Sequence, residues 1–325
     1  MLALIWSVAL SGGLPVPVAP PRQPGAVLSA RFFSPALGAW KRYFVYLPAS
    51  YPQQRARRYP VAYYLHGYGG NESDWLSRAD IAGVMDSLVA AGLPEMILVL
   101  PDGDNGWYAT WAEPRDPVAC AADSTLAEAA AAYCVARQRY DDYVAVDLVT
   151  HIDSTYRTVA DRAHRGIAGL SMGGYGAVTL ALRRPDVFAA AASHSGALSP
   201  FYAGPHPYAD PPRYYTSPDS LAAAWGGTVS FRRAPVFGAD TAHWWEMDPA
   251  HLVRALLAAH RAVPALFLDV GSSDGFVDEN RAFHAELTAL GVAHEYTEWS
   301  GRHNWPYWSA HVAESLSWLA RRLAR

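Results

Sequence analysis

Hydrophobic residues along this chain form short continuous runs that alternate with stretches of helical spacing. The continuous runs at 60–65 and 96–100 are typical of strands buried on both faces, whereas 140–156 places its apolar residues on one stripe of a helix. The predicted strands are 27–33, 41–47, 60–65, 96–100, 165–168, 187–192, 265–270 and 294–299, and the predicted helices are 78–91, 140–156, 174–184, 249–260, 280–290 and 306–323. Strands that alternate with helices predict an α/β fold, with a mostly parallel central sheet covered by helices on both faces.

Two long stretches interrupt this alternation. Residues 107–139 are rich in alanine, and residues 199–248 are rich in proline and aromatic residues. Insertions of this length in a compact domain are usually lids or binding surfaces. No internal repeat or Gly/Ser linker separates them from the rest, so we predict a single domain over 27–325 with insertions near 107–139 and 199–248.

The N-terminus differs from the rest of the chain. An apolar stretch over 2–10 is followed by small residues and a Pro-rich run over 15–24, although no Lys or Arg precedes the apolar stretch. This pattern predicts that 1–26 is a signal peptide with a Pro-rich leader, and that the protein is secreted or periplasmic. Without a signal peptide the location would be cytoplasmic. Cys120 and Cys134 flank an alanine-rich stretch, and the sequence leaves open whether they form a disulfide or are free and buried.

Composition excludes several classes of protein. The chain has 325 residues, 51% of them hydrophobic, and a net charge of −4. This hydrophobic share argues against disorder, and the absence of a basic block argues against nucleic-acid binding. No apolar run approaches the roughly 20 residues of a membrane-spanning helix, so we expect no stable membrane insertion. No histidine or cysteine pattern has metal-ligand spacing, and we expect neither a metal nor a cofactor.

The segment Gly169-Leu170-Ser171-Met172-Gly173 matches G-x-S-x-G, the turn that carries the nucleophile of many hydrolases. A predicted strand precedes it, and small residues begin the helix that follows, so the serine can stand clear of the sheet. The segment Gly271–Gly275 also matches, with Ser273 at its centre. There, however, the bulky Phe276 opens the next turn, and too little chain remains for the other catalytic residues. We therefore predict Ser171 as the nucleophile.

The acid and the base are predicted from their order along the chain. In this architecture they follow the nucleophile, each at the carboxyl end of a later strand. Asp274 follows the strand that ends at 270, and His303 follows the strand that ends at 299. We predict that His303 accepts the Ser171 proton and that Asp274 orients the imidazole. Asp278 and Glu279 are interpreted instead as acidic residues favoured in the first turn of a helix.

Five sequence blocks, in this order, resemble the esterase D family of α/β-hydrolases, which includes S-formylglutathione hydrolases, feruloyl and acetylxylan esterases and the mycobacterial mycolyltransferase antigens. The blocks are Tyr63-Tyr64-Leu65-His66-Gly67, Pro101-Asp102-Gly103, Gly169-Leu170-Ser171-Met172-Gly173-Gly174, Gly271-Ser272-Ser273-Asp274 and Gly301-Arg302-His303-Asn304-Trp305. The resemblance implies an α/β-hydrolase fold and an oxyanion hole made by the backbone N–H groups of Tyr68 and Met172. The two insertions depart from the family, and the chain lacks the extra cysteine and the charged pattern expected for a glutathione thioester substrate.

The substrate is less well specified by the sequence. His66, Trp107 and Trp305 are candidate substrate contacts, and the aromatic residues near the predicted site favour an apolar or aromatic acyl group. We predict a serine carboxylesterase that hydrolyses short-chain or aromatic acyl esters, either small molecules or esters linked to a polysaccharide. An acyltransferase of the mycolyltransferase type is the alternative, because it would use the same triad with an alcohol acceptor. A non-catalytic binding module is disfavoured because all three triad residues are present. The sequence leaves the oligomeric state open.

Overall fold

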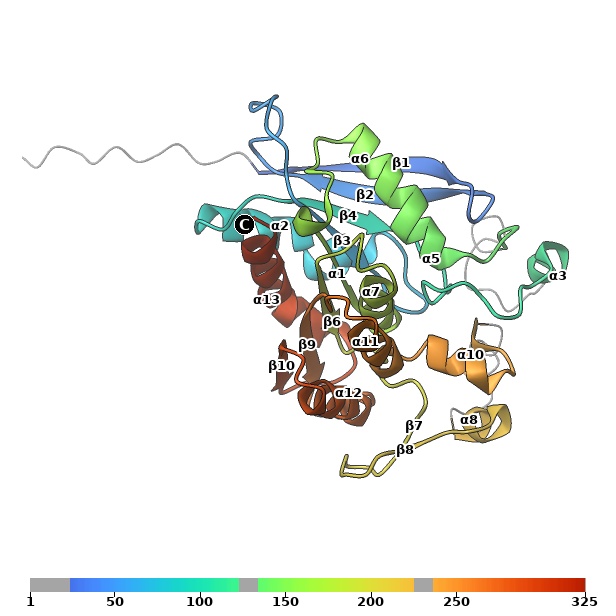
Figure 1. Cartoon of the computed structure of the whole chain (residues 1–325). Helices are drawn as coiled ribbons and strands as arrows, with labels where there is room; N and C mark the ends of the chain where they lie inside the picture. Colours follow the sequence, from blue (N-terminus) through green and yellow to red (C-terminus); the bar gives the residue numbers. More distant parts are fainter. Residues whose placement is uncertain (1–23, 123–133, 225–235, 325) are drawn as a thin grey trace, which may run out of the picture.

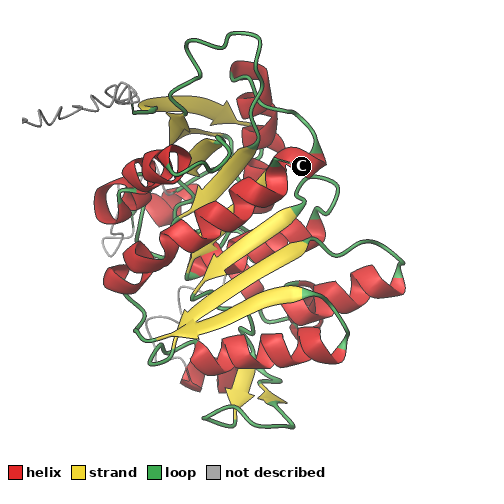
Figure 2. Cartoon of the chain, turned by 90° about the vertical axis from the view of Figure 1, so that its left-hand side faces the viewer, coloured by secondary structure: helices red, strands yellow, loops and turns green. Residues whose placement is uncertain are grey.

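The computed structural model describes residues 24–122, 134–224 and 236–324, so nearly all of the predicted leader over 1–26 lies outside the described residues. Its centre is a sheet of eight strands (Figures 1 and 2). In spatial order the strands are β1 (Ala26–Ser34), β2 (Ala39–Leu47), β4 (Ile97–Pro101), β3 (Val61–Leu65), β5 (Arg165–Leu170), β6 (Ala190–His194), β9 (Ala265–Gly271) and β10 (His294–Trp299).

Strand direction brings the chemistry-bearing loops to one edge of the sheet. Within this sheet, the six strands β4, β3, β5, β6, β9 and β10 are mutually parallel. Strand β2 is antiparallel to both β1 and β4. Parallel strands all end at the same edge, so the loops after β3, β5, β9 and β10 lie together there. The predicted α/β-hydrolase architecture, with its mostly parallel sheet, is confirmed.

Helices cover both faces of the sheet (Figure 1), as predicted. One face packs against α1 (Asp74–Ala79), α2 (Ile81–Ala90) and α13 (Trp305–Leu323). The other face packs against α6 (Val149–Thr155), α7 (Met172–Arg183), α11 (Pro249–Ala258) and α12 (Val277–Ala289). A short 3₁₀ turn, η2 (Arg162–His164), leads into β5. No helix within the described ranges is both long and apolar enough to cross a bilayer.

Three predicted elements differ from the structure. The predicted helix over 78–91 is two helices, because Asp80 adopts a left-handed conformation with φ of 44° and its carboxylate accepts the Gly83 N–H at the start of α2. The predicted helix over 140–156 consists of α5 (Tyr140–Asp142), a π-helical segment η1 (Tyr143–Leu148) and α6. The strand predicted at 187–192 is β6, which begins at Ala190 and runs on to His194.

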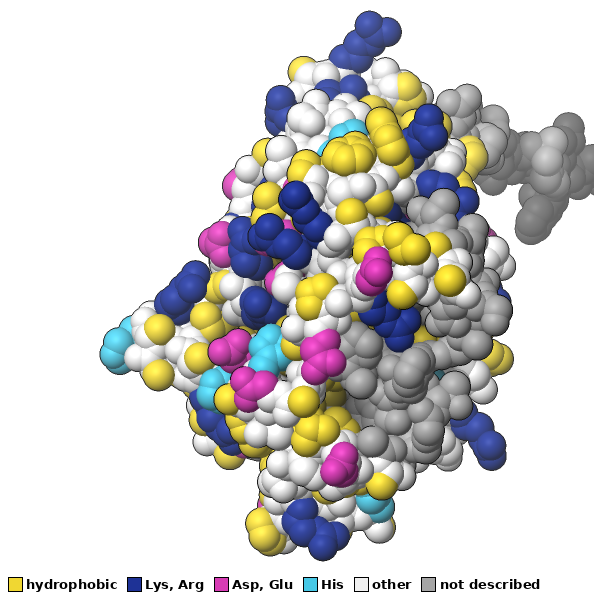
Figure 3. Space-filling model, turned by 90° about the vertical axis from the view of Figure 1, so that its right-hand side faces the viewer, with side chains coloured by type: hydrophobic (Ala, Val, Ile, Leu, Met, Phe, Trp, Pro, Cys, Tyr) yellow, Lys and Arg dark blue, Asp and Glu magenta, His cyan; other side chains and the backbone are white. Residues whose placement is uncertain are grey.

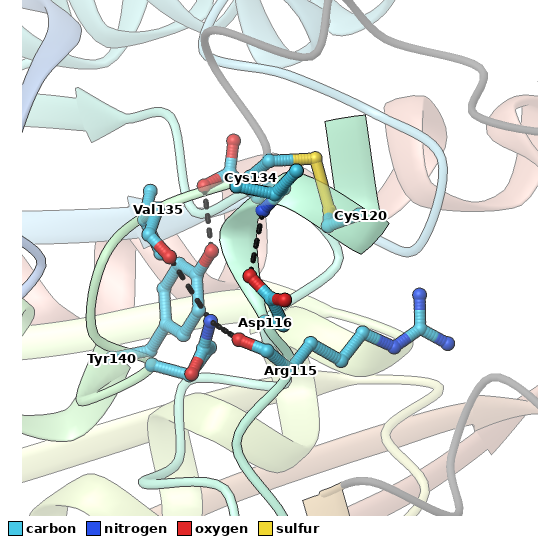
Figure 4. The surroundings of a disulfide bond; sticks show 9 residues. Arg115, Asp116, Cys120, Cys134, Val135 and Tyr140 are labelled. Atoms are coloured by element: carbon cyan, nitrogen blue, oxygen red, sulfur yellow. Dashed lines mark hydrogen bonds between the residues drawn. A yellow bond between two sulfur atoms is a disulfide. The ribbon is translucent and has the colours of Figure 1, made fainter. Parts of the chain in front are cut away.

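The described part of the first insertion contains α3 (Pro117–Ala121) and a disulfide between Cys120 and Cys134 (Figure 4). Asp116 lies beside the disulfide, and its carboxylate accepts the Val118 N–H at the start of α3. The alternative of two free cysteines, which the sequence left open, does not hold in this structure. The intervening residues 123–133 lie outside the described residues.

The described part of the second insertion is built around aromatic packing. It contains β7 (Tyr202–Gly204), β8 (Arg213–Tyr214), α8 (Pro218–Ala224) and α10 (Thr241–Glu246), and β7 pairs with β8 in a two-stranded sheet. The ring of Phe201 stacks on Trp244 with centroids 4.9 Å apart. This packing ties α10 to the chain that follows β6.

Removing the disulfide is expected to destabilise the protein. The bond closes a loop between residues 14 positions apart, and a loop of that size corresponds to about 3 kcal/mol of lost chain entropy in the unfolded state. The double variant Cys120→Ala/Cys134→Ala should therefore lower the free energy of unfolding by up to about 3 kcal/mol. Urea denaturation of both proteins measures the difference. Equal midpoints in the absence of reductant would contradict the expectation.

Candidate active site

Ser171 lies at the sharp turn between β5 and α7, with φ of 54° and ψ of −119°. The turn is possible because glycines flank it. A Cβ atom on Gly169 would lie 2.3 Å from the Gly173 carbonyl oxygen, and one on Gly173 would lie 2.5 Å from the Leu65 carbonyl oxygen. The Ser171 N–H donates to the His194 carbonyl at 2.9 Å, which holds the turn to β6. Strain of this kind at a single residue is characteristic of functional sites.

The structure brings Ser171, His303 and Asp274 into one hydrogen-bonded chain. The Ser171 Oγ lies 2.8 Å from His303 Nε2, and His303 Nδ1 lies 3.0 Å from each Asp274 carboxylate oxygen. Since an ionised carboxylate can only accept, Nδ1 carries the proton and Nε2 is left as the acceptor for the serine hydroxyl. The buried Asp274 carboxylate also accepts the Phe276 N–H at 2.8 Å, which fixes its orientation.

The alternative residues considered from the sequence lie elsewhere. Ser273 is exposed in the turn after β9, and its N–H donates to the Gly301 carbonyl. Asp278 lies in the first turn of α12 as expected, but its carboxylate binds the second insertion, accepting the Tyr208 N–H and pairing with His206 and Arg281. Neither residue takes part in the hydrogen-bonded chain of Ser171, His303 and Asp274.

The two predicted oxyanion donors lie on either side of this turn. Met172 is the first residue of α7, so its N–H has no acceptor within the helix and can serve an anion at the helix N-terminus. Tyr68 belongs to the loop after β3, between Gly67 and Gly69. That loop lies close against the turn, because a Cβ atom on Gly67 would come within 2.6 Å of the Leu170 side chain and 3.4 Å of the Ser171 Cβ. This proximity is consistent with the predicted oxyanion hole.

His66 is buried and supports the loop instead of facing a ligand. Its exposed fraction is 1%, its Nε2 accepts the Gly103 N–H at 2.8 Å, and its Nδ1 lies 2.8 Å from the Gly67 carbonyl. Burial lowers the pKa of the imidazole below its usual 6.5, which favours the neutral ring that these two contacts require. The structure therefore does not support His66 as a substrate contact, because no part of the ring is available to a ligand.

The loop after β4 holds the loop of Tyr68 through a second contact that the sequence did not indicate. Asn105 Oδ1 accepts the Gly69 N–H at 2.6 Å. The base of the loop is fixed by Lys41, whose buried ammonium lies 3.1 Å from Asp102 and 2.6 Å from Asp104. Burial raises the pKa of Asp104 to about 7, although Lys41 opposes the shift. The sequence gives two weak indications of these contacts. One is the polar run that follows the apolar strand β4, and the other is Lys41 within the aromatic strand β2.

Removing the Asn105 contact should slow catalysis without weakening substrate binding. Asn105→Ala leaves the Gly69 N–H without its acceptor and loosens the neighbouring Tyr68 N–H, so we expect kcat on p-nitrophenyl acetate to fall about tenfold with little change in KM, less than for outright loss of an oxyanion donor. Asn105→Asp keeps an acceptor at the same place and is the matched control. A rise in KM alone, or equal losses in both variants, would contradict this role.

The two predicted tryptophan contacts have different surroundings. Trp107 is 2% exposed and packs edge-on against Tyr175 and Phe237, with centroids 5.6 and 6.0 Å away, so it belongs to the core behind α7. The structure therefore does not place Trp107 at an accessible substrate site. Trp305 is half-buried at the start of α13, two residues after His303, and packs against Trp75 at 5.7 Å. The rings that lie closest around His303 are instead Phe276 and Trp308, at 4.9 and 5.0 Å.

The described residues contain no cluster of His, Cys, Asp or Glu side chains that could hold a metal ion. The groups that meet at the site are the hydroxyl of Ser171, the imidazole of His303, the carboxylate of Asp274 and nearby backbone N–H groups. A nucleophile with an adjacent base, itself oriented by a third group, is the arrangement needed for acyl transfer through a covalent intermediate.

Comparison with known proteins places this chain among esterases. A family model described as "Putative esterase" matches residues 34–319. An acetyl esterase of Caldicellulosiruptor saccharolyticus is 25% identical over 303 residues, which cover 91% of this chain and 98% of the relative. An esterase of Mycobacterium tuberculosis is 29% identical over 84% of this chain, which spans only 54% of that relative.

Solved structures show the same architecture. A ferulic acid esterase superposes with a TM-score of 0.64 at 27% identity, over 92% of this chain and 98% of the other. An S-formylglutathione hydrolase from Staphylococcus aureus superposes with a TM-score of 0.65 at 19% identity, over 91% of this chain and 99% of the other. At that lower identity the likeness concerns the fold alone.

Proposed function

Because this chain belongs to that esterase family and is a carboxylic ester hydrolase of the α/β-hydrolase fold, we propose that Ser171, His303 and Asp274 are its catalytic triad. The observation that carries the proposal is the 2.8 Å contact between Ser171 Oγ and His303 Nε2, with His303 Nδ1 held by Asp274. No other described serine pairs with a histidine that a carboxylate orients at an accessible site: Ser315 contacts His194, which pairs with Asp269, but that group is fully buried.

In the proposed mechanism, Ser171 Oγ attacks the carbonyl carbon of the ester while its proton passes to His303 Nε2. The negative charge that develops on the carbonyl oxygen is stabilised by the N–H groups of Tyr68 and Met172. Collapse of this intermediate breaks the bond to the alcohol oxygen, which takes the proton from His303, and leaves the acyl group on Ser171. Water then attacks the acyl-enzyme while His303 accepts a proton from it. The bond to Ser171 Oγ breaks, this oxygen takes the proton from His303, and the free acid is released.

The acyl group that we propose is short or aromatic. Two relatives support this choice, namely the acetyl esterase and the ferulic acid esterase described above. The half-buried ring of Phe276 and the buried ring of Trp308 pack edge-on against the His303 imidazole. Aromatic side chains so close to the reacting atoms favour small or planar acyl groups over polar ones.

A panel of p-nitrophenyl esters from acetyl to octanoyl, together with methyl ferulate, tests this proposal. The highest kcat/KM is expected on acetyl or feruloyl esters, with a steep fall toward octanoyl. Product analysis with and without a simple alcohol separates hydrolysis from the alternative, a transferase of the mycolyltransferase type. Free acid should remain the main product when alcohol is added. A dominant new ester, or a preference for the longest acyl chain, would overturn the proposal.

We further propose that the protein is exported. The apolar stretch over 2–10 and the small residues after it support export, and so does the disulfide, because such bonds persist in oxidising compartments. Mass spectrometry of the protein recovered from its native cells tests this. Export predicts a mature chain that begins after residue 10 and has no free thiol. An intact N-terminus with two free thiols would contradict it.

A further inference from the structure

A groove away from the triad runs along the outer edge of the sheet. It lies where the β1–β2 hairpin meets η1 and the start of α6, and its volume is about 570 Å³. Its lining combines aromatic side chains with polar ones, among them Arg31, Phe33, Trp40, Asp147, Thr150 and His151. Nothing in the proposed ester hydrolysis uses these residues.

The aromatic part of the groove is exposed to an unusual degree for this chain. Trp40 is 59% exposed and Phe33 is 48% exposed, and their rings meet edge to face with centroids 5.9 Å apart. The guanidinium of Arg31 lies 5.1 Å from the centroid of Trp40 and helps to hold that ring in place. Contiguous exposed aromatic surface on a folded protein commonly marks a binding site.

The polar part of the groove suits a ligand rich in hydroxyl groups. Thr150 is exposed, and burial lowers the pKa of His151, which favours the neutral ring. The His151 Nε2 lies 2.9 Å from the Tyr43 hydroxyl, so Nδ1 is the ring nitrogen left for a ligand. The Asp147 carboxylate accepts from the Ser34 hydroxyl at 2.6 Å and from the Ala36 N–H at 2.8 Å, which fixes the hairpin against the helix. Arg31 forms no ion pair with any carboxylate of the described residues, so it can receive an acidic group of a ligand.

The groove lies on the same side of the molecule as the triad. Tyr43 of β2 pairs with Pro101, the last residue of β4, so the earlier part of β2, which carries Trp40, extends past the carboxyl edge of the parallel strands. Four strand spacings separate β1 from β5, which corresponds to about 19 Å. Figure 3 looks onto this side of the molecule and shows hydrophobic side chains gathered in its upper part, with basic ones nearby.

We propose that this groove binds the polysaccharide chain of an esterified substrate, several sugar units away from the ester that is cleaved. The C–H face of a sugar ring packs on Trp40 and Phe33, its hydroxyl groups bond to Thr150 and His151, and a uronic acid substituent pairs with Arg31. This inference rests on the proposed function, because it assigns the alcohol part of the ester to a polysaccharide.

A second copy of this chain fits the groove less well than a sugar chain does. Stable protein interfaces bury on the order of 1,200 Å² or more, with an apolar centre. Here the exposed apolar surface consists of Trp40, Phe33 and a neighbouring Val146, and the unpaired Arg31 is in contact with it. A groove with mixed aromatic and polar lining matches the chemistry of a single glycan strand.

Binding is tested first without catalysis. Full-length Ser171→Ala protein is run by affinity electrophoresis in gels that contain soluble glucuronoxylan or neutral arabinoxylan. It is compared with the double variant Ser171→Ala/Trp40→Ala. Trp40→Ala should weaken retention about tenfold on both polymers. Arg31→Ala should weaken it on glucuronoxylan only. Leu28→Ala is the matched control, because Leu28 is 45% exposed on β1, the strand of Arg31, but lies outside the groove.

Catalysis supplies the second measurement, in protein with Ser171 intact. Trp40→Ala should keep the kcat/KM of the parent on p-nitrophenyl acetate, while its KM on acetylated glucuronoxylan rises about tenfold. Equal retention of parent and Trp40→Ala on both polymers would overturn the inference, and so would a shift from dimer to monomer on sedimentation of Trp40→Ala. A parent protein that is retained by the polymers but inactive on every ester would instead overturn the proposed function.

Discussion

Ser171→Ala is expected to lower kcat on p-nitrophenyl acetate by about a million-fold, leaving only a residual acceleration from substrate binding and the oxyanion hole. Alanine removes the one oxygen that lies 2.8 Å from His303 Nε2, so no acyl-enzyme can form. Fold and stability should not suffer, because alanine fits the Ser171 backbone about as well as serine does and the flanking glycines are unchanged. Titration of the acetic acid released over long incubations measures the rate, and circular dichroism checks the fold.

Ser273→Ala is the matched control for that experiment. Ser273 occupies the second G-x-S-x-G match of the chain, but it lies exposed in the turn after β9 and is bonded through its backbone. Its removal should leave kcat within about twofold of the parent, as is usual for a surface substitution. A large loss in Ser273→Ala together with normal activity in Ser171→Ala would move the nucleophile to the other turn.

Asp274→Asn is expected to lower kcat by about ten-thousand-fold. The asparagine amide can donate a hydrogen bond to His303 Nδ1, which favours the tautomer with its proton on Nε2, where it cannot accept the proton of Ser171. The loss should be mainly in kcat, since Asp274 is buried behind the imidazole and does not face the substrate. A comparable effect on KM would point to a disrupted loop in place of a misoriented base.

Asp278→Asn provides the comparison for the acid. Asp278 lies four residues further along the chain and is also acidic and largely buried, but it holds the second insertion through Tyr208 and His206. Asp278→Asn should therefore leave kcat on small esters within about threefold of the parent, because it changes none of the residues that accept or orient the Ser171 proton. If both variants lost activity equally, the distinction between the two carboxylates would be wrong.

The meeting of the three proposed catalytic residues at one edge could be predicted because it depends on strand direction alone. Each of Ser171, Asp274 and His303 follows a predicted strand, and parallel strands must end at one edge. The prediction needs no knowledge of how the strands are ordered in the sheet. For the same reason the mostly parallel sheet was predictable. The break at Asp80 was not, because a single left-handed residue does not change the spacing of hydrophobic residues along the helix.

The contacts that hold the loop of Tyr68 could not be predicted in this way. Asn105 lies in the loop after β4 and Lys41 lies in β2, far apart in the sequence, and no short pattern links either of them to Gly69. Trp107 shows the opposite limitation. A tryptophan in an insertion near the site is a reasonable candidate ligand contact, but only the packing of Tyr175 and Phe237 around it determines that it is buried.

The separation of Ser171 from His303 along the chain has a consequence for biosynthesis. The two residues are 132 positions apart, and α13, which follows His303, packs against the sheet near β5. At translation speeds of about 5–20 residues per second, the ribosome needs roughly 7 to 26 seconds to deliver the histidine after the serine. With the proposed triad, the nascent chain can fold its first strands during that interval but carries an inert hydroxyl, so ester cleavage inside the producing cell cannot begin before His303 has been synthesised.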